Sequence, residues 1–305
     1  KDRTELGYER GRKMKGKKIS MFRIISFIVL FMYVLSMFLM LLWALMTSLK
    51  TPDEYYENIL GFPKSLAFSN YAEVFKNFVA ISEGPNSLQE SVYIEGMLFN
   101  TLMYAGIGGF LATLTPMVTA YAVAKYNFKF SKVIYFIVIV TMILPVVGAY
   151  PAELDLLMRM GLYDTIYGSW IQKTNFTTMY FLVFYAAFKG LSAEFTEAAY
   201  VDGASEFRLM YNVMFPLAKN VFATVFLITF ISLWNDYQAP ALYIPSYPTL
   251  AYGVYYVCIR DNRGIFTYIP GHMTVCTIVA MPIIILFIAF KNKLIGNLTM
   301  GGIKG

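Results

Sequence analysis

The residues of this chain whose types and spacing could support chemistry gather in one short stretch. Residues 189–219 hold four carboxylates and three cations between two long apolar runs. Charges at this density cannot lie in hydrocarbon, so the stretch is predicted to be a solvated loop between membrane spans. The chemistry that these side chains offer is electrostatic, and the plain interpretation of the stretch is an ordinary hydrophilic loop.

Metal binding and catalysis find little support elsewhere in the chain. His272 is the single histidine, which excludes a multi-histidine metal site, and Cys258 and Cys276 give neither a disulfide framework nor a metal-ligand spacing. Residues 11–18 superficially match a phosphate-binding loop, but the terminal Ser or Thr is missing and no strand precedes them. We therefore expect no catalytic residue, no metal and no nucleotide site, and the scattered carboxylates do not suggest a membrane-embedded enzyme.

The local sequence of the charged stretch predicts two short helices joined by a turn. Residues 197–200 favour a helix, and Gly203 is expected to end it because glycine accepts turn geometry without steric cost. Ser205 can then cap a second short helix over residues 206–213, and Pro216 follows in a Met-Phe-Pro-Leu step. Together these elements predict a compact knob on the face of a membrane.

The composition of the whole chain is that of an integral membrane protein. Of its 305 residues 58% are hydrophobic, and only 14% are charged, well below the ~25% of a soluble domain. Uninterrupted apolar runs of helix length favour helices over a barrel, whose strands would alternate. We predict an all-α integral membrane protein with six transmembrane helices at about 24–46, 98–124, 133–150, 166–188, 214–235 and 272–290.

The distribution of charge orients these spans. Six spans place the basic tail 1–23, the charged loop 189–213 and the tail 291–305 on one side of the membrane. Eighteen of the 25 lysines and arginines lie on that side and twelve of the 19 acids on the other, which makes that side the cytoplasm. The net charge of +6 thus reflects topology, so we expect membrane lipid and no nucleic acid as a partner, although a polybasic tail could also bind RNA or anionic lipid.

The fourth span is the least regular of the six. Residues 172–175, Gln-Lys-Thr-Asn, interrupt it, and polar groups at mid-span cost up to ~3 kcal/mol each. Such a break can mark a transport pathway, but we favour a Lys173 side chain that snorkels to the outer surface. A proton- or sodium-driven secondary transporter would need buried ionisable groups at mid-membrane. The six spans contain no Asp, Glu or Arg, which argues against that class.

The charged stretch resembles a known motif. EAAYVDGASEFRLMYNVMFPLAKN, which begins at Glu197, has Glu-Ala-Ala, three residues, Gly and a later hydrophobic-Pro step. It resembles the EAA motif of binding-protein-dependent ABC import permeases, in which this loop is the coupling helix that docks into a cleft on a cytoplasmic ATPase. The resemblance assigns ATPase coupling to Glu197, Ala198, Ala199, Asp202, Gly203, Ala204 and Pro216.

The resemblance continues from the first span to the last residue. It includes Ser-Leu-Lys-Thr at 48–51, Asn-Tyr at 70–71, Met-Gly-Leu-Tyr-Asp-Thr at 160–165, Trp-Asn at 234–235 and Pro-Thr-Leu-Ala at 248–251. The ending Gly-Gly-Ile-Lys-Gly is similar to the family's Gly-x-Lys-Gly and implies a tail contact made by Gly302, Lys304 and Gly305. Asp-Gly-Ala at 202–204, this ending and the short first outer loop are typical of MalG-like carbohydrate permeases.

The resemblance implies the permease subunit of an ATP-driven importer with the type I ABC importer permease fold. It would move a carbohydrate, an oligosaccharide in particular, across the bacterial cytoplasmic membrane by alternating access. The implied partners are a second, MalF-like permease, two copies of a cytoplasmic ABC ATPase and an extracellular or periplasmic solute-binding protein. ATP and Mg would be bound by the ATPase, so this chain would hold no cofactor and be no enzyme. A permease for an amino acid or a phosphonate shares the EAA loop and is the nearest alternative.

The substrate path is the least specified part of the sequence. Sugars are commonly held by aromatic faces and hydrogen-bonding polar groups, although such residues are more often packing or interface-belt residues. Two outer segments also stand out: residues 80–91 look like an insertion without an assigned role, and residues 260–264 could protrude toward an external partner. The candidates that could face a cavity are Asn100, Tyr104, Thr141, Tyr180, Trp234, Asn235 and Tyr237.

Overall fold

The computed structural model of the protein describes residues 21–85, 90–126, 128–144, 148–261 and 263–300. Within these ranges the regular secondary structure is helical apart from one short two-stranded sheet. The basic tail expected before residue 21 and the tail residues Gly302, Lys304 and Gly305 lie outside the described residues, so their predicted contacts stay predictions.

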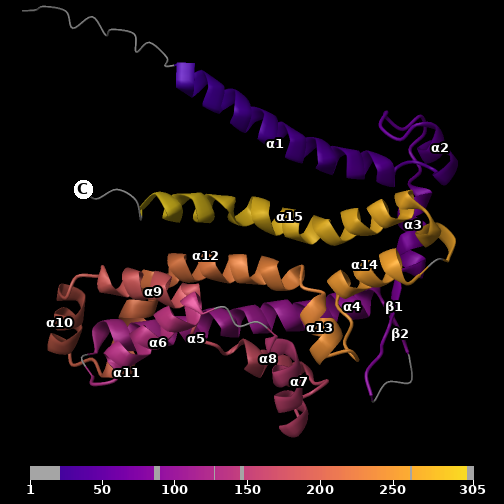
Figure 1. Ribbon diagram of the computed structural model, residues 1–305. Coiled ribbons are helices and arrows are strands. Elements are labelled where there is room, and N and C mark those ends of the chain that lie inside the picture. Colours follow the sequence, from indigo (N-terminus) through magenta and orange to yellow (C-terminus); the bar gives the residue numbers. More distant parts are fainter. Residues whose placement is uncertain (1–20, 86–89, 127, 145–147, 262, 301–305) are drawn as a thin grey trace, which may run out of the picture.

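Among the described residues, four helical rods are long and apolar enough to cross a membrane. They run side by side along the length of the molecule (Figure 1). They cover the first, second, fifth and sixth predicted spans. The rods are α1 (Met21–Ser48); α4 (Ile94–Thr101) with the π-helix η1 (Leu102–Ile107) and α5 (Gly108–Lys125); α11 (Glu206–Leu209) with the π-helix η2 (Met210–Met214) and α12 (Phe215–Trp234); and α15 (Ile269–Met300).

The helix at the third predicted span is shorter than the sequence suggested. Helix α6 (Ser131–Ile143) ends well before residue 150, and Tyr150 belongs to the next helix, α7 (Ala149–Arg159). Leu144 has extended dihedrals, φ −78° and ψ 115°, because a residue that precedes a proline avoids the helical region. Gly148 then has a positive φ of 77°, so the chain turns where the apolar pattern predicted a continuous span.

The fourth predicted span is broken, as its polar residues indicated. Helix α8 (Ile166–Lys173) is followed by the non-helical residues 174–178 and then by α9 (Met179–Lys189). At ~1.5 Å per residue, the 13 residues of α6 and the 11 of α9 are shorter than the ~30 Å hydrocarbon core. Each therefore needs neighbouring segments to complete a crossing.

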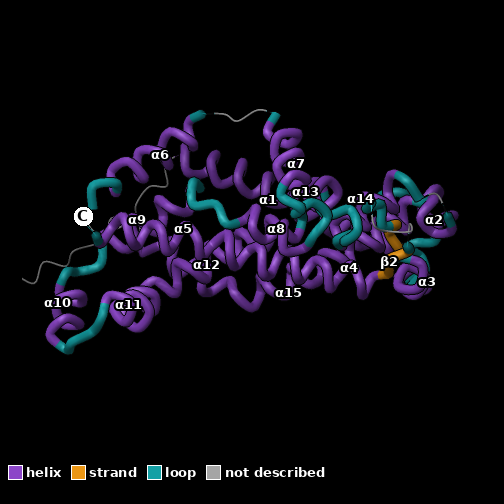
Figure 2. Tube along the Cα trace, turned by 90° about the horizontal axis from the view of Figure 1, so that it is seen from below, coloured by secondary structure: helices purple, strands orange, loops and turns teal. Residues whose placement is uncertain are grey.

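One end of the molecule is built from short elements of the outer loops (Figure 2). The two-stranded sheet lies at this end and forms a hairpin in which Ala80 is opposite Val92. Glu83, just after the first strand, forms an ion pair with Arg260 and donates its backbone N–H to the carbonyl of Pro245 at 3.2 Å. The described ends of the apparent insertion 80–91 thus tie the first outer loop to the last one. The short elements at this end of the molecule are α2 (Pro52–Glu57), α3 (Ser69–Asn77), β1 (Val79–Ile81), β2 (Ser91–Tyr93), α13 (Gln238–Tyr243), α14 (Leu250–Ile259) and the 3-10 helix η3 (Gly264–Thr267).

The opposite end holds α10 (Glu194–Val201) and α11. The start of α1 and the end of α15 lie at this same end, as an even number of crossings requires (Figure 1). Two buried clusters, one toward each end, hold the bundle together; fully buried Trp234 belongs to the outer cluster and fully buried Phe188 to the inner one. Helix α1 packs beside α15, and before its last turns most of its apolar side chains are exposed, so lipid or another subunit must cover them.

We expect the start of α15 to tolerate no side chain at Gly271. A Cβ there would overlap the backbone carbonyl of Ile265, whereas a Cβ at Gly106 in η1 would meet no atom within 4 Å. Overpacking of this kind costs about 1–3 kcal/mol, so Gly271→Ala should lower the unfolding temperature and Gly106→Ala should not. Thermal unfolding in detergent measures both, and equal unfolding temperatures for the two variants would contradict the close packing of η3 on α15.

Candidate functional site

The knob predicted from the charged stretch is built around the end of α10. The N–H of Gly203 donates to the carbonyl of Tyr200 at 3.0 Å, and the N–H of Ala204 donates to that of Ala199 at 2.9 Å. Gly203 has a φ of +72°. These two hydrogen bonds and the left-handed residue form a Schellman motif, which satisfies the last carbonyls of a helix. The prediction that Gly203 ends the first helix is confirmed.

The second predicted helix of the knob is not a separate element. Ser205 caps it by accepting the N–H of Arg208 at 3.4 Å, but α11 has only four residues and continues through η2 into α12. Pro216, near the start of α12, cannot donate to the preceding turn, and its ring needs space there. A widened π turn directly before a proline provides such space. The second half of the knob is therefore the first turns of a long rod.

Six of the seven residues assigned to coupling lie together on α10 and the turn that follows it. Ala199 is 6% exposed and packs into the inner cluster, and Ala204 is partly buried beside it. The other four are exposed, so they are free to contact a partner. Pro216 is exposed but lies on α12, beyond the knob. The exposed coupling residues on α10 and its turn are Glu197, Ala198, Asp202 and Gly203.

The knob also exposes apolar side chains that the sequence analysis did not single out. Phe195 and Val201 on α10 and Phe207 on α11 are exposed, Val201 by 87% and Phe207 by 71%. Large apolar side chains at a charged end of the molecule are a signature of a docking face. The sequence did contain a signal for these residues, because they are large apolar side chains within a segment whose charges predict a solvated loop.

Tyr104, a path candidate, is fully buried in η1 and donates its hydroxyl to Asp236 at 2.8 Å. Lys173 lies over the Tyr104 ring, with its Nζ 5.3 Å from the ring centroid, where the negative face of the ring attracts a cation. This position differs from the preferred expectation that Lys173 snorkels to the outer surface: its Nζ lies over the ring of buried Tyr104, near the carboxylates of Glu153 and Asp236. Trp170 donates to the carbonyl of Met103 in the same π-helix at 2.9 Å.

A second carboxylate extends this arrangement. Glu153 on α7 accepts hydrogen bonds from Tyr243 at 2.7 Å and from Gln172 at 3.2 Å. Burial, followed by the hydrogen bond to Glu153, raises the pKa of the Tyr243 phenol. We name these six residues the outer polar cluster: Tyr104, Glu153, Gln172, Lys173, Asp236 and Tyr243. It joins α7, α8, α13 and η1, and sequence reasoning found only part of it because half of its members lie outside the predicted spans.

The other path candidates do not form one site. Most of them make structural hydrogen bonds or pack in a cluster, which is the alternative the sequence analysis left open. Asn100 donates to the carbonyl of Pro248 at 3.0 Å, Thr141 donates to that of Ile137 at 3.0 Å, Trp234 donates to that of Val279 at 3.4 Å, and Tyr180 packs against the inner cluster.

Asn235 and Tyr237 line a groove of about 640 Å³ between α1, α14 and α15. Tyr237 stacks on Tyr255, with ring centroids 4.9 Å apart. The remaining lining is mainly apolar, with Cys258 and Cys276 on facing helices. An apolar groove with one aromatic stack and an amide is chemically suited to a sugar face or to an apolar partner surface.

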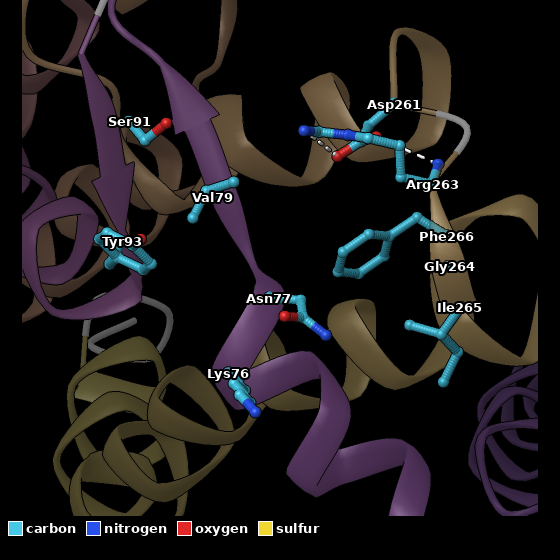
Figure 3. A pocket seen from close by; sticks show the side chains of 10 residues that line it. All are labelled: Lys76, Asn77, Val79, Ser91, Tyr93, Asp261, Arg263, Gly264, Ile265 and Phe266. Carbon is cyan, nitrogen blue, oxygen red and sulfur yellow. Dashed lines mark hydrogen bonds and ion pairs between the residues drawn. The ribbon is translucent and has the colours of Figure 1, made fainter.

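A smaller cavity of about 390 Å³ lies at the outer end, between α3, the hairpin and the residues around η3 (Figure 3). Buried Asp261 accepts two side-chain hydrogen bonds from Arg263, at 2.8 and 3.0 Å. This hydrogen-bonded ion pair raises the pKa of Arg263. Of the segment 260–264, which was expected to protrude, Arg260 forms an ion pair with Glu83 of the first loop, whereas the Arg263–Asp261 pair is local. Among the described residues, no group of three or more His, Cys, Asp or Glu could hold a metal ion.

Comparison with known proteins decides the family. Residues 112–295 match the model of the binding-protein-dependent transport system inner membrane component. The chain belongs to this family. As an ABC importer permease it is a membrane transport subunit, and the ATPase of such importers is a separate subunit. Membership of this family excludes the two alternatives of a secondary transporter and a membrane-embedded enzyme.

Individual relatives agree with this family. The permease is 26% identical over 282 residues to the probable starch degradation products transport system permease protein AmyC of Thermoanaerobacterium thermosulfurigenes, across 87% of this chain and 93% of that one. It is 24% identical to the melibiose/raffinose/stachyose import permease protein MelC of Bacillus subtilis, across 86% and 89%.

A solved structure supports the fold of the permease. A chain from the crystal structure of a bacterial ABC transporter involved in the import of the acidic polysaccharide alginate superposes with a TM-score of 0.73 at 22% identity. The superposition covers 89% of this chain and 95% of that one. The predicted all-α ABC importer permease fold is confirmed.

Proposed function

We propose that this permease forms one half of the pore of a bacterial importer for a carbohydrate, an oligosaccharide in particular. The observation that carries the proposal is the knob of α10 and residues 202–204, which exposes charged and apolar side chains at one end of a bundle of long apolar helices. The names of AmyC and MelC support a carbohydrate cargo over an amino acid or a phosphonate.

The proposed mechanism is ATP-driven alternating access. Closure of an ATPase dimer would move two knobs together, and the attached helices would rock as rigid bodies. Such coupling requires contacts that differ between the two states. We infer that the exposed Glu197 makes an electrostatic contact with a basic ATPase residue, and that Gly203 sets the angle of the knob. ATP and Mg would bind to the ATPase, not to this chain.

We infer three partners from the uncovered surfaces. A second, MalF-like permease would cover part of the apolar surface of α1 and the groove beside Tyr237. Two copies of an ABC ATPase would meet the two permeases at their knobs. An extracellular or periplasmic solute-binding protein would meet the end that carries α2, α3 and the hairpin. This arrangement places both termini, the knob and the proposed tail contact of Gly302, Lys304 and Gly305 in the cytoplasm.

The composition of the native complex tests the proposal. The permease is purified in mild detergent from its own membranes, and the proteins that accompany it are identified by mass spectrometry. We expect a second permease and a Walker-motif ATPase in a ratio of one to one to two, after which the matching solute-binding protein is screened with oligosaccharides. Recovery of the chain alone or as a homodimer, with no ATPase, would exclude this assembly.

A further inference from the structure

Glu206, the first residue of α11, holds together three segments of the inner end. One carboxylate oxygen accepts the hydroxyl of Tyr126 at 2.6 Å, and the other accepts the hydroxyl of Tyr200 at 2.7 Å. Tyr126 directly follows α5, and Tyr200 lies on α10. One side chain therefore connects the coupling helix, the end of the second rod and the start of the α11–α12 rod. We name Glu206, Tyr126 and Tyr200 the inner clasp.

The inner clasp continues into the core. The Tyr126 hydroxyl lies 3.2 Å from that of Tyr121, and buried Tyr121 packs edge-on against Phe188 at 5.3 Å between ring centroids. Beside it, Lys125 donates to the carbonyl of Leu191 at 3.1 Å, in the segment that leads into α10. A continuous series of contacts therefore runs from the knob, through the inner clasp, to α5 and α9.

The electrostatics favour an ionised Glu206 carboxylate and protonated Tyr126 and Tyr200 phenols. The hydrogen bonds from Tyr126 and Tyr200 lower the pKa of the Glu206 carboxyl. Burial and the hydrogen bond to Glu206 raise the pKa of Tyr126, and the same carboxylate raises that of Tyr200. At neutral pH an ionised acceptor thus faces two protonated donors, which gives short, directional, charge-assisted hydrogen bonds.

The space beside the inner clasp shows why α10 needs this connection. A cavity of about 480 Å³ lies between α10 and the ends of α5 and α9, with Lys125, Glu197 and Tyr200 in its lining. Helix α10 contributes one buried residue to the core, Ala199. Because a hollow separates much of α10 from the bundle, the phenol–carboxylate hydrogen bonds are the polar contacts that fix its angle.

We propose that Glu206 is a positioning residue for ATPase coupling: through Tyr126 and Tyr200 it transmits a displacement of α10 to both the α5 rod and the α11–α12 rod. This rests on the proposed function and adds a residue and a route to it. An acid at the first position of a helix also stabilises that helix N-terminus. Asp155 on α7 lies outside the knob and is an exposed carboxylate that accepts a hydrogen bond from Arg159, so it supplies the matched control.

The test compares single and double variants in the complete importer, reconstituted in vesicles with its partners. Glu206→Gln, Tyr126→Phe and the double variant preserve side-chain volume, and Asp155→Asn is the control. We expect substrate transported per ATP hydrolysed to fall by about tenfold in each clasp variant, the scale of one charge-assisted hydrogen bond. The double variant should lose no more than the stronger single variant, and Asp155→Asn should match the wild type.

The outcomes separate the inner clasp from the proposed function. A wild-type complex that neither binds an ATPase nor transports would overturn the proposed function itself. A wild-type complex that transports, with clasp variants whose transport per ATP equals that of Asp155→Asn, would overturn the inner clasp alone. Should Glu206→Gln assemble poorly, Tyr126→Phe and Tyr200→Phe decide the question, because each removes one hydroxyl and leaves the carboxylate in place. If the losses of transport per ATP from these two variants multiply when the variants are combined, the two hydrogen bonds act independently. That result would overturn a joint linkage.

Discussion

Replacing Gly203 with valine should reduce substrate transport at least tenfold while the permease still inserts and assembles. The residue has a φ of +72° at the centre of the Schellman motif. A β-branched side chain resists this left-handed conformation, which costs ~1–2 kcal/mol even for an unbranched residue. To relieve that strain the turn must change, and the angle of α10 with it. Transport and substrate-stimulated ATP hydrolysis in proteoliposomes are the measurements.

Asparagine at the same position is the matched control. A Cβ at Gly203 would meet no atom within 4 Å, so neither variant introduces a clash and only the backbone preference differs. Asparagine tolerates the left-handed region far better than valine does, so Gly203→Asn should retain most of the transport. If both variants transport equally well, the conformation of Gly203 does not set the angle of the knob, and its role in coupling is lost.

Local chemistry allowed much of this fold to be predicted from the sequence. The four long rods follow from uninterrupted apolar runs, and the turn at Gly203 follows from a glycine that ends a helix-forming segment. The third span was predicted too long because hydropathy counts apolar residues and ignores the backbone restriction before Pro145. The second helix of the knob was predicted to be a separate element, because a π-helix that continues into a helix with a proline near its start has no clear sequence signature.

The outer polar cluster could not be predicted from the sequence, for a different reason. Its contacts join residues that are far apart in the chain: Tyr104 bonds to Asp236, 132 residues away, and Glu153 to Tyr243, 90 residues away. A lysine near a span end has a local solution, extension to the surface. Only the fold shows that Lys173 has the face of Tyr104 and two carboxylates within reach instead.

Lys173 and Asp236 are expected to depend on each other for stability. Lys173→Met and Asp236→Asn should each lower the unfolding temperature of the permease, because each leaves the other charge with less compensation in a partly buried site. The double variant should lose less than the sum of the two single losses, with a coupling energy of about 1–2 kcal/mol. Thermal unfolding of the wild type and the three variants, in the same detergent, completes the double-mutant cycle.

Arg159→Met is the control that separates the effect of burial on the unfolding temperature from the effect of losing a cation. Arg159 pairs with Asp155 at 2.7 Å, four residues earlier on α7, but both side chains are largely exposed. Exposed pairs of this spacing are worth only ~0.3–0.5 kcal/mol, so this loss of a cation should hardly change the unfolding temperature. If Lys173→Met proves as mild as Arg159→Met, or if the Lys173 and Asp236 losses simply add, the outer polar cluster does not stabilise the outer end. If the cycle shows coupling, the same charges hold α8 and the start of α13 against η1, and they fix the geometry of the bundle at the end opposite the knob.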